Sequence, residues 1–259
     1  MTEELHTDRP HPARVYDYLL GGEVNFPADR EAAHQGMRGN PDSRIPPRQN
    51  RLFLHRAVRF LAGQGIDQFL DIGTGIPSAP HVHHVAQEIN PAARVVYVDN
   101  DPIVLAHARP LLTGQTQYIE ADLRELDVST LSDVLDLNRP VGLLLIAVLH
   151  FVGDKDEPAA IVERLLAALP SGSYLALSHL TGDYRPEAWE HVTEIYRRQG
   201  VTMQVRSHER ISRFFSGLSL VEPGLRILPD WRPELGEPGG EPVPSEAQVS
   251  VYGGVARKL

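Results

Sequence analysis

The sequence contains no cysteine, so disulfides, thiol nucleophiles and cysteine-ligated metal sites are excluded. Positive charge is also sparse: the formal net charge is −9 and no block of Lys and Arg stands out, which argues against a nucleic-acid partner. Long hydrophobic runs are missing, because the longest, at 141–149, is too short to cross a bilayer, and the N-terminus has no apolar signal core. We therefore expect a cytoplasmic protein that binds neither nucleic acid nor membranes.

A cap of helices is predicted ahead of the first strand. Apolar residues recur at helical spacing over 13–20, and further helices are expected from Pro27 to about Gly36 and from Pro46 onward. We expect the 259 residues to form a single domain. Its parts are an N-terminal helical cap over 1–64 and a core over 65–259 that carries a long loop at about 223–247.

Beyond the cap, strand and helix patterns alternate, which predicts βαβ units and a doubly wound α/β fold with a mostly parallel sheet. Two late stretches, near 218–221 and 248–256, should form an antiparallel pair at one sheet edge. The other expected strands are 68–72, 94–99, 116–120, 141–147 and 174–178, and the expected helices lie around 80–89, 102–112, 129–136, 157–169, 187–199 and 208–215.

A glycine turn follows the first strand. Gly73 and Gly75 come directly after Asp71, so a ligand could approach bare backbone there. A dinucleotide-binding turn needs a third glycine where Ser78 stands. The Asp71 carboxylate would repel a pyrophosphate, whereas it suits the ammonium or sulfonium of S-adenosylmethionine. The methyl donor is favoured, and a dinucleotide-dependent oxidoreductase stays as the weaker alternative.

Acidic residues close the next two predicted strands. Asp99 ends the strand at 94–99, and Asp122 follows the strand at 116–120. Carboxyl ends of neighbouring parallel strands lie side by side, so both carboxylates should lie near the glycine turn. Asp99 could accept hydrogen bonds from both ribose hydroxyls. Asp122 could accept one from an adenine amino group, or it could instead cap a helix.

These features resemble class I S-adenosylmethionine-dependent methyltransferases over roughly 65–180, with the rest of a seven-stranded sheet beyond. The whole chain is similar to an actinobacterial family of S-adenosyl methyltransferases, the DUF574 group. The resemblance implies S-adenosylmethionine as cofactor and S-adenosylhomocysteine as product. It is carried by RVYDYLLGG at 14–22, Asn25-Phe26, Asn50-Arg51, DIGTG at 71–75, VDNDP at 98–102, EPGL at 222–225 and WRP at 231–233.

The resemblance also implies roles for single residues. The glycine turn would border the methionine part of the cofactor, Asp99 the ribose, and Asp122 with Leu123 the adenine, while the strand end from Ala147 to His150 would lie under the sulfonium. The full set expected at the cofactor is Asp71, Gly73, Thr74, Gly75, Asp99, Asn100, Asp122, Leu123, Ala147 and His150.

Other polar residues are candidates for the acceptor side. His150 could act as a general base, because an ordinary histidine pKa lies near working pH, or it could hold the cofactor or cap a helix. His179, after the fifth strand, could contact substrate. The N-terminal polar residues either belong to an amphipathic helix and its cap or form a lid over the cofactor; they are Arg14, Tyr16, Asp17, Tyr18 and Asn25.

The histidines at 81–84 and Trp231 each allow more than one interpretation. His81, His83 and His84 resemble a metal cluster, but only His81 and His84 share a helix face and no third ligand is suitably spaced. We therefore expect no metal site. Trp231, in the late loop, is expected to be either an exposed anchor or a pocket wall.

The expected function is transfer of a methyl group to a small-molecule acceptor by in-line displacement. The acidic balance and the helical cap favour a small molecule over a protein or RNA acceptor. A non-catalytic protein that binds S-adenosylmethionine or S-adenosylhomocysteine is the main alternative, since it would keep the same glycine turn and acids.

Overall fold

A mixed sheet forms the centre of the structure, a computed structural model that describes residues 6–111, 113–236 and 242–259. Its strand order is β3-β2-β1-β4-β5-β8-β6, and β7 pairs with another part of β8. Strands β1 to β5 run parallel, whereas β8 is antiparallel to β5, β6 and β7. The strands are β1 Gln68–Ile72, β2 Arg94–Asp99, β3 Thr116–Glu120, β4 Gly142–Ile146, β5 Tyr174–Leu180, β6 Ser219–Leu220, β7 Arg226–Ile227 and β8 Val251–Arg257.

This topology confirms the predicted α/β fold with a seven-strand, mostly parallel sheet, to which β7 adds a short extra pairing. Every residue of β1 and of β4 is buried, as expected for central strands covered on both faces. The antiparallel pair expected near 218–221 and 248–256 is present as β6 and β8. The last strand begins at Val251, because the residues just before it form the short helix α9.

Three helices precede β1, as predicted. Asp101 caps the later helix α5 by accepting a hydrogen bond from the Ile103 N–H at 3.0 Å. Among the described residues, no helix is both long and apolar enough to cross a membrane. The helices are α1 Pro12–Leu20, α2 Pro27–Gly39, α3 Ile45–Gly63, α4 Val82–Ile89, α5 Pro102–Ala108, α6 Pro158–Ala167, α7 Pro186–Arg198, α8 His208–Ser212 and α9 Glu246–Val249.

One predicted helix is shorter and of another kind. The stretch at 129–136 contains a 3-10 helix, Val128–Leu131, followed by turns. Asp127 starts it by accepting hydrogen bonds from the backbone and the hydroxyl of Ser129, at 2.9 and 2.7 Å. Short polar side chains that bond locally in this way compete with the α-helix, which is why the helical pattern overstated the element.

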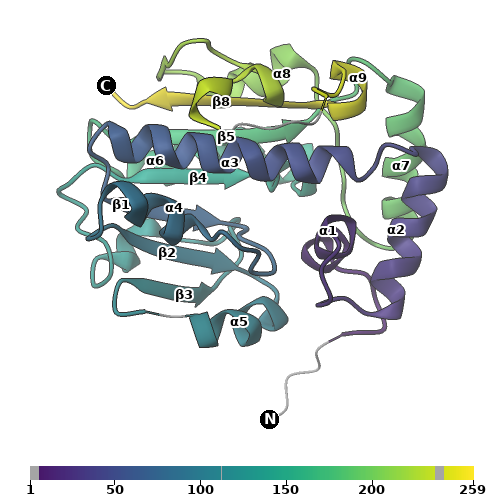
Figure 1. Cartoon of the computed structure of the whole chain (residues 1–259), viewed down its shortest axis with the longest axis horizontal. Coiled ribbons are helices and arrows are strands. Elements are labelled where there is room, and N and C mark those ends of the chain that lie inside the picture. Colours follow the sequence, from purple (N-terminus) through teal and green to yellow (C-terminus); the bar gives the residue numbers. More distant parts are fainter. Residues whose placement is uncertain (1–5, 112, 237–241) are drawn as a thin grey trace.

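Helices gather at the edge where the parallel strands end. Figure 1 shows α1, α2 and α7 beyond the ends to which β2, β3 and β4 point, while α3 crosses one face of the sheet. Polar contacts hold α7 to the cap: Gln199 donates to Gln35 at 3.1 Å, and Arg185 forms an ion pair with Asp42 at 2.7 Å. Ligands bind at this edge in open α/β sheets, so the cap lies over the expected site.

The late segment rich in proline and glycine is anchored on α3. The Trp231 side chain is fully buried and lies edge-on to Phe53 and Phe60, with ring centroids 5.3 and 6.0 Å apart. Arg56 of α3 donates to the carbonyl oxygens of Trp231 and Leu228, at 2.9 and 2.6 Å. Trp231 is therefore a core residue, and the expectation of an exposed anchor or pocket wall was wrong. Part of the predicted long loop, 237–241, lies outside the described residues.

Replacing Trp231 by alanine should lower the free energy of unfolding by ~3–5 kcal/mol, because it removes a large, fully buried aromatic side chain. Urea denaturation measures this. Leu220→Ala, at a side chain with 43% exposure, is the control and should cost less than ~1 kcal/mol. If both variants unfold alike, the segment is not part of the core.

Candidate active site

The glycine turn after β1 has the backbone shape that the sequence predicts. Gly73 and Gly75 have φ of 73° and 68°, in the left-handed region that favours glycine. The Gly73 and Thr74 N–H groups donate to the Val98 carbonyl, at 2.8 and 3.2 Å, which fixes the turn to β2. A Cβ on Gly73 would lie 2.4 Å from a methyl group of Val148. A Cβ built on Gly75 would have its nearest neighbouring atom 3.9 Å away, so the turn is open at that residue.

Asp99 ties the end of β2 to this turn. One carboxylate oxygen accepts a hydrogen bond from the Gly75 N–H at 2.8 Å, and the other accepts one from the Asp101 N–H at 3.0 Å. Burial raises the pKa of Asp99, while the two backbone donors and nearby His11 oppose that change. Each oxygen keeps a further lone pair, so the carboxylate can accept more hydrogen bonds from a ligand.

Asp71 is a buried carboxyl whose surroundings compensate its charge only in part. Burial raises its pKa to about 6, although the Thr74 side chain and the Arg51 guanidinium act in the opposite direction. The Arg51 guanidinium is itself bound to the carbonyl oxygens of Ser78 and Pro80, at 2.7 and 2.8 Å. A cationic ligand beside Asp71 would therefore stabilise its ionised form.

Asp122 makes local hydrogen bonds and also faces the site. Its carboxylate accepts from the backbone and the guanidinium of Arg124, both at 2.9 Å, and from Asn100 at 3.4 Å. These contacts lower the pKa of Asp122, with the Arg124 side chain as the main cause. Residues 123–125 form a turn, so no helix follows directly for Asp122 to cap. Its carboxylate is held within that turn and also lines the cavity beside the glycine turn.

All of these groups line one cavity of about 370 Å³ at the carboxyl ends of β1 to β4. That volume lies within the range of small-ligand pockets. Of the residues expected at the cofactor, the cavity brings together Asp71, Gly73, Thr74, Gly75, Asp99, Asn100, Asp122, Leu123 and Ala147. The cap contributes to its lining from two places: His11, Pro12, Ala13 and Tyr16 in and just before α1, and Asn50, Arg51 and Leu54 of α3.

His150 lies in a second, smaller pocket of about 80 Å³. The two hollows meet, because Pro12, Tyr16, Asn50, Ala147 and Phe151 line both. The small pocket is enclosed by α1, α2, the start of α3, α7 and the ends of β5 and β8. Its remaining lining residues are Leu19, Ala33, Gly36, Ser43, Pro46, Pro47, Leu180, Trp189, Val192, Tyr196, Met203 and Val251.

A chain of hydrogen bonds crosses the junction of the two hollows. The Ala147 N–H donates to the Ser178 hydroxyl at 2.9 Å, and that hydroxyl donates to the Asn50 side-chain oxygen at 2.5 Å. The Asn50 amide donates to the Tyr16 hydroxyl at 2.9 Å, which donates to the Pro47 carbonyl at 3.0 Å. Ala147 itself has a φ of 54°, a strained conformation for a residue with a Cβ. The chain thus couples the sheet edge to the cap.

Four residues expected on the acceptor side or in a lid have other partners, and none lines either hollow as far as the chain is described. Arg14 is buried and paired with Asp101 at 3.2 Å. Tyr18 bonds to His34 at 2.8 Å, and Asn25 donates to Asp17 at 2.9 Å. His179 is fully buried, where it accepts from Arg206 at 2.8 Å and donates to the Leu180 carbonyl at 2.7 Å.

Sequence reasoning missed Asn50 and Trp189 as lining residues, whereas Tyr16 was among the residues considered for a lid and lines both hollows. Tyr16 and Asn50 fall inside the segments that carried the family resemblance, which was the available signal. Trp189 lies on α7, far along the chain, and nothing in its local pattern marks it. In the part of the chain that the structure describes, no cluster of His, Asp or Glu side chains is arranged to hold a metal ion.

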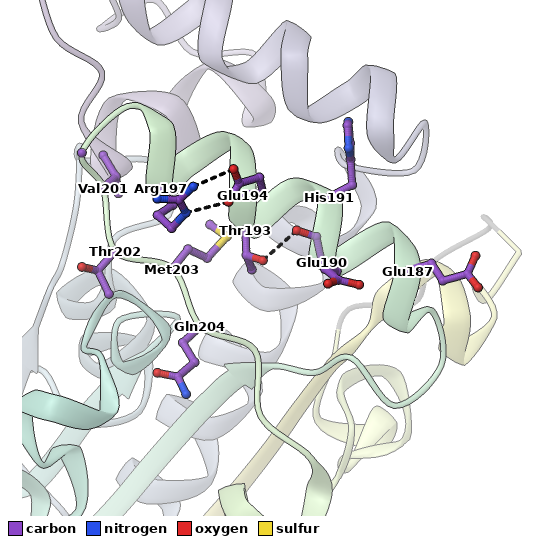
Figure 2. Close-up of a pocket in the computed structure, with 11 residues that line it drawn as sticks. Glu187, Glu190, His191, Thr193, Glu194, Arg197, Val201, Thr202, Met203 and Gln204 are labelled. Atoms are coloured by element: carbon purple, nitrogen blue, oxygen red, sulfur yellow. Dashed lines mark hydrogen bonds and ion pairs between the residues drawn. The ribbon is translucent and has the colours of Figure 1, made fainter.

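An outer groove of about 720 Å³ runs along α7 and is charged (Figure 2). Glu194 pairs there with Arg197 at 2.6 Å, and Glu187, Glu190 and His191 belong to the same lining. The segment 200–204 forms its far wall and also borders the two inner hollows: residues 200–202 line the cavity, and Met203 lines the small pocket. The groove is thus separated from the site by one stretch of chain.

Comparison with known proteins fits this geometry. The family model of the S-adenosyl methyltransferases matches residues 1–259. A DUF574 family protein from Streptomyces avermitilis MA-4680 is 43% identical, with 99% of this chain and 100% of that chain covered and a TM-score of 0.93. A protein from Thermobifida fusca YX is 38% identical, with 99% and 97% covered and a TM-score of 0.90.

A more distant likeness concerns the fold alone. The N-methyltransferase NodS from Bradyrhizobium japonicum WM9, crystallised with S-adenosyl-L-homocysteine, is 14% identical, with 95% of this chain and 98% of that chain covered and a TM-score of 0.50. No curated protein matches the chain in sequence. The match over the full length and the two relatives near 40% identity show that the chain belongs to the S-adenosyl methyltransferase family, which depends on S-adenosylmethionine.

Proposed function

We propose that this methyltransferase binds S-adenosylmethionine in the cavity of about 370 Å³ and methylates a small molecule held in the adjoining pocket. One observation carries the proposal: residues from three successive strand ends line a single cavity. They are Asp71 with the glycine turn, Asp99 and Asp122. Family membership favours the methyl donor over a dinucleotide.

The residues that line the cavity match the chemical groups of the cofactor one by one. Asp71 offers a buried, partly compensated carboxylate for the cationic methionine end, next to the open backbone at Gly75. Asp99 offers free lone pairs to ribose hydroxyls, with Asn100 beside it. Asp122 and Leu123 are assigned to the adenine, where the carboxylate accepts from an amino group and the leucine packs against the ring.

The bound cofactor supplies a methyl group that is already activated by a sulfonium, so in-line displacement by a nucleophile is sufficient chemistry. The protein must then align the acceptor and exclude water. Ala147 at the junction, with Tyr16 and Asn50 beside it, is assigned to that alignment. The pocket beyond it favours a catalytic protein over a non-catalytic binder, which would need no such space.

We assign His150 to contact with the acceptor molecule rather than to the role of general base. Burial lowers its pKa well below the ordinary value, and the neighbouring His179 and Arg206 act in the same direction. The imidazole is therefore neutral at working pH and can accept or donate one hydrogen bond. Carrying a full positive charge at this position is unfavourable, which weakens the role of general base.

Asp99→Ala should weaken binding of S-adenosylmethionine by ~10–100-fold, since it removes hydrogen bonds to a charged acceptor. Isothermal titration calorimetry measures the affinity. Asp99 also holds the Gly75 N–H, so the melting temperature of the free protein must be measured in parallel. Unchanged affinity in a folded variant would refute the ribose assignment.

Asp71→Asn should weaken cofactor binding at least ~10-fold and yet stabilise the free protein by about 1–3 kcal/mol at pH 7.5. The folded pKa of about 6 lies above the ordinary value of 3.8, so protonation favours the folded state. The wild type loses stability relative to the variant as pH rises from about 4 to about 6, and the difference is constant above that.

Urea denaturation of both proteins at pH 5 and pH 7.5 tests this sign, because the advantage of the variant should be larger at the higher pH. The exposed Asp133→Asn is the matched control and should change stability little at either pH. An Asp71→Asn protein that is less stable than the wild type at pH 7.5 would show that the carboxylate is well compensated in the free protein.

A further inference from the structure

We propose that the pocket of about 80 Å³ selects the methyl acceptor as a compact, uncharged and largely apolar molecule whose oxygen accepts a hydrogen bond from Trp189. This inference rests on the proposed function, because it names the acceptor class for the same site. Four properties of the pocket carry it: its charge, its unpartnered polar atoms, its size and its connection to the cofactor cavity.

No Asp, Glu, Lys or Arg side chain lines the pocket within the described parts of the chain. Aliphatic, proline and aromatic side chains form most of the wall, and its polar groups come from Tyr16, Ser43, Asn50, His150, Trp189 and Tyr196. A charged group placed there would lose its hydration without gaining a partner of opposite charge. Carboxylates, phosphates and protonated amines are therefore disfavoured.

Two buried polar atoms in this wall have no hydrogen-bond partner among the described residues. They are Nε1 of Trp189 and Nδ1 of His150, and their side chains are 5% and 4% exposed. Buried polar groups are nearly always hydrogen-bonded in folded proteins, so unpartnered atoms beside a hollow point to a ligand. The indole N–H can only donate, so the matching ligand atom is an acceptor such as a hydroxyl, ether or carbonyl oxygen.

Size and position complete the description. The pocket is far smaller than the 300–1,000 Å³ typical of drug-sized ligands, so it holds a compact molecule of roughly one ring. Its border with the cofactor cavity is the junction at Tyr16, Asn50 and Ala147. A ligand in the pocket therefore meets the cofactor cavity at the residues already assigned to alignment.

Gly36 of α2 offers a direct way to fill the pocket. It is buried and lines the hollow, and a Cβ built on it would meet no atom within 4 Å apart from its chain neighbours and the backbone of its own helix. Its backbone is α-helical, so a larger side chain is tolerated there and glycine is the weaker helix former. Gly36→Leu should occupy the space without disturbing the fold.

The test uses the full chain saturated with S-adenosylhomocysteine and three probes: phenol, benzoate and benzylamine. Phenol should bind at least tenfold more tightly than either charged probe in calorimetric titrations. Trp189→Phe should weaken phenol binding about five- to tenfold, and Gly36→Leu should abolish it. Both variants should retain wild-type affinity for S-adenosylhomocysteine.

Trp231→Phe is the matched control, because Trp231 is also buried and its Nε1 is likewise unpartnered among the described residues, yet it packs on α3 and does not line the pocket. This control should bind phenol as the wild type does. Failure of the wild type to bind S-adenosylhomocysteine would refute the proposed function. Normal binding of S-adenosylhomocysteine, with phenol bound no better than the charged probes or unaffected by Gly36→Leu, would refute this inference alone.

Discussion

The Asp99 carboxylate is the constraint on which the site depends. It holds the Gly75 N–H on one side and the Asp101 N–H on the other, so it joins the glycine turn, the end of β2 and the start of α5. The buried Asp101 in turn forms an ion pair with Arg14 at 3.2 Å and lies 3.1 Å from the imidazole of His11, whose pKa is lowered by burial. Asp99 and Asp101 therefore connect the ends of the parallel strands to the cap, and displacing either carboxylate would move the wall of the cavity.

The cap is built into the site through these buried charges. Arg14 lies between Asp101 and Asp29, which is 3.6 Å away, so α1 is tied both to α2 and to the core. Buried ion pairs often add little net stability, but they specify one arrangement because breaking them leaves a buried charge. The sequence left Arg14 either in an amphipathic helix or in a lid over the cofactor. Its contacts in the structure fix the position of α1, which brings Tyr16 to both hollows.

The sheet and the acid-bearing strand ends could be predicted from the sequence because they depend on local patterns: apolar runs, glycines and terminal carboxylates. The residues of the acceptor pocket could not be predicted in this way. Tyr16 and Tyr18 are only two residues apart on α1 and point to different neighbours, which depends on how α1 packs. Trp189 reaches the pocket only because α7 lies against α2. The prediction of an α-helix at 129–136 was wrong because hydrogen bonds from Ser129 to the Asp127 side chain favour a different local structure than the apolar periodicity indicates.

The hydrogen-bond chain from Ala147 to Pro47 has a fixed direction, and this limits what the junction can offer to a ligand. The Ser178 hydroxyl already donates its hydrogen bond to Asn50, and the Tyr16 hydroxyl donates its own to Pro47, while burial raises the pKa of Tyr16 and keeps it protonated. Only lone pairs remain on these oxygens. Of the two, only Tyr16 lines the hollows, so a donor group on a ligand could bind the free lone pair of its hydroxyl. The second amide N–H of Asn50 is the donor that the chain leaves for an acceptor atom, so the junction offers a ligand one acceptor and one donor.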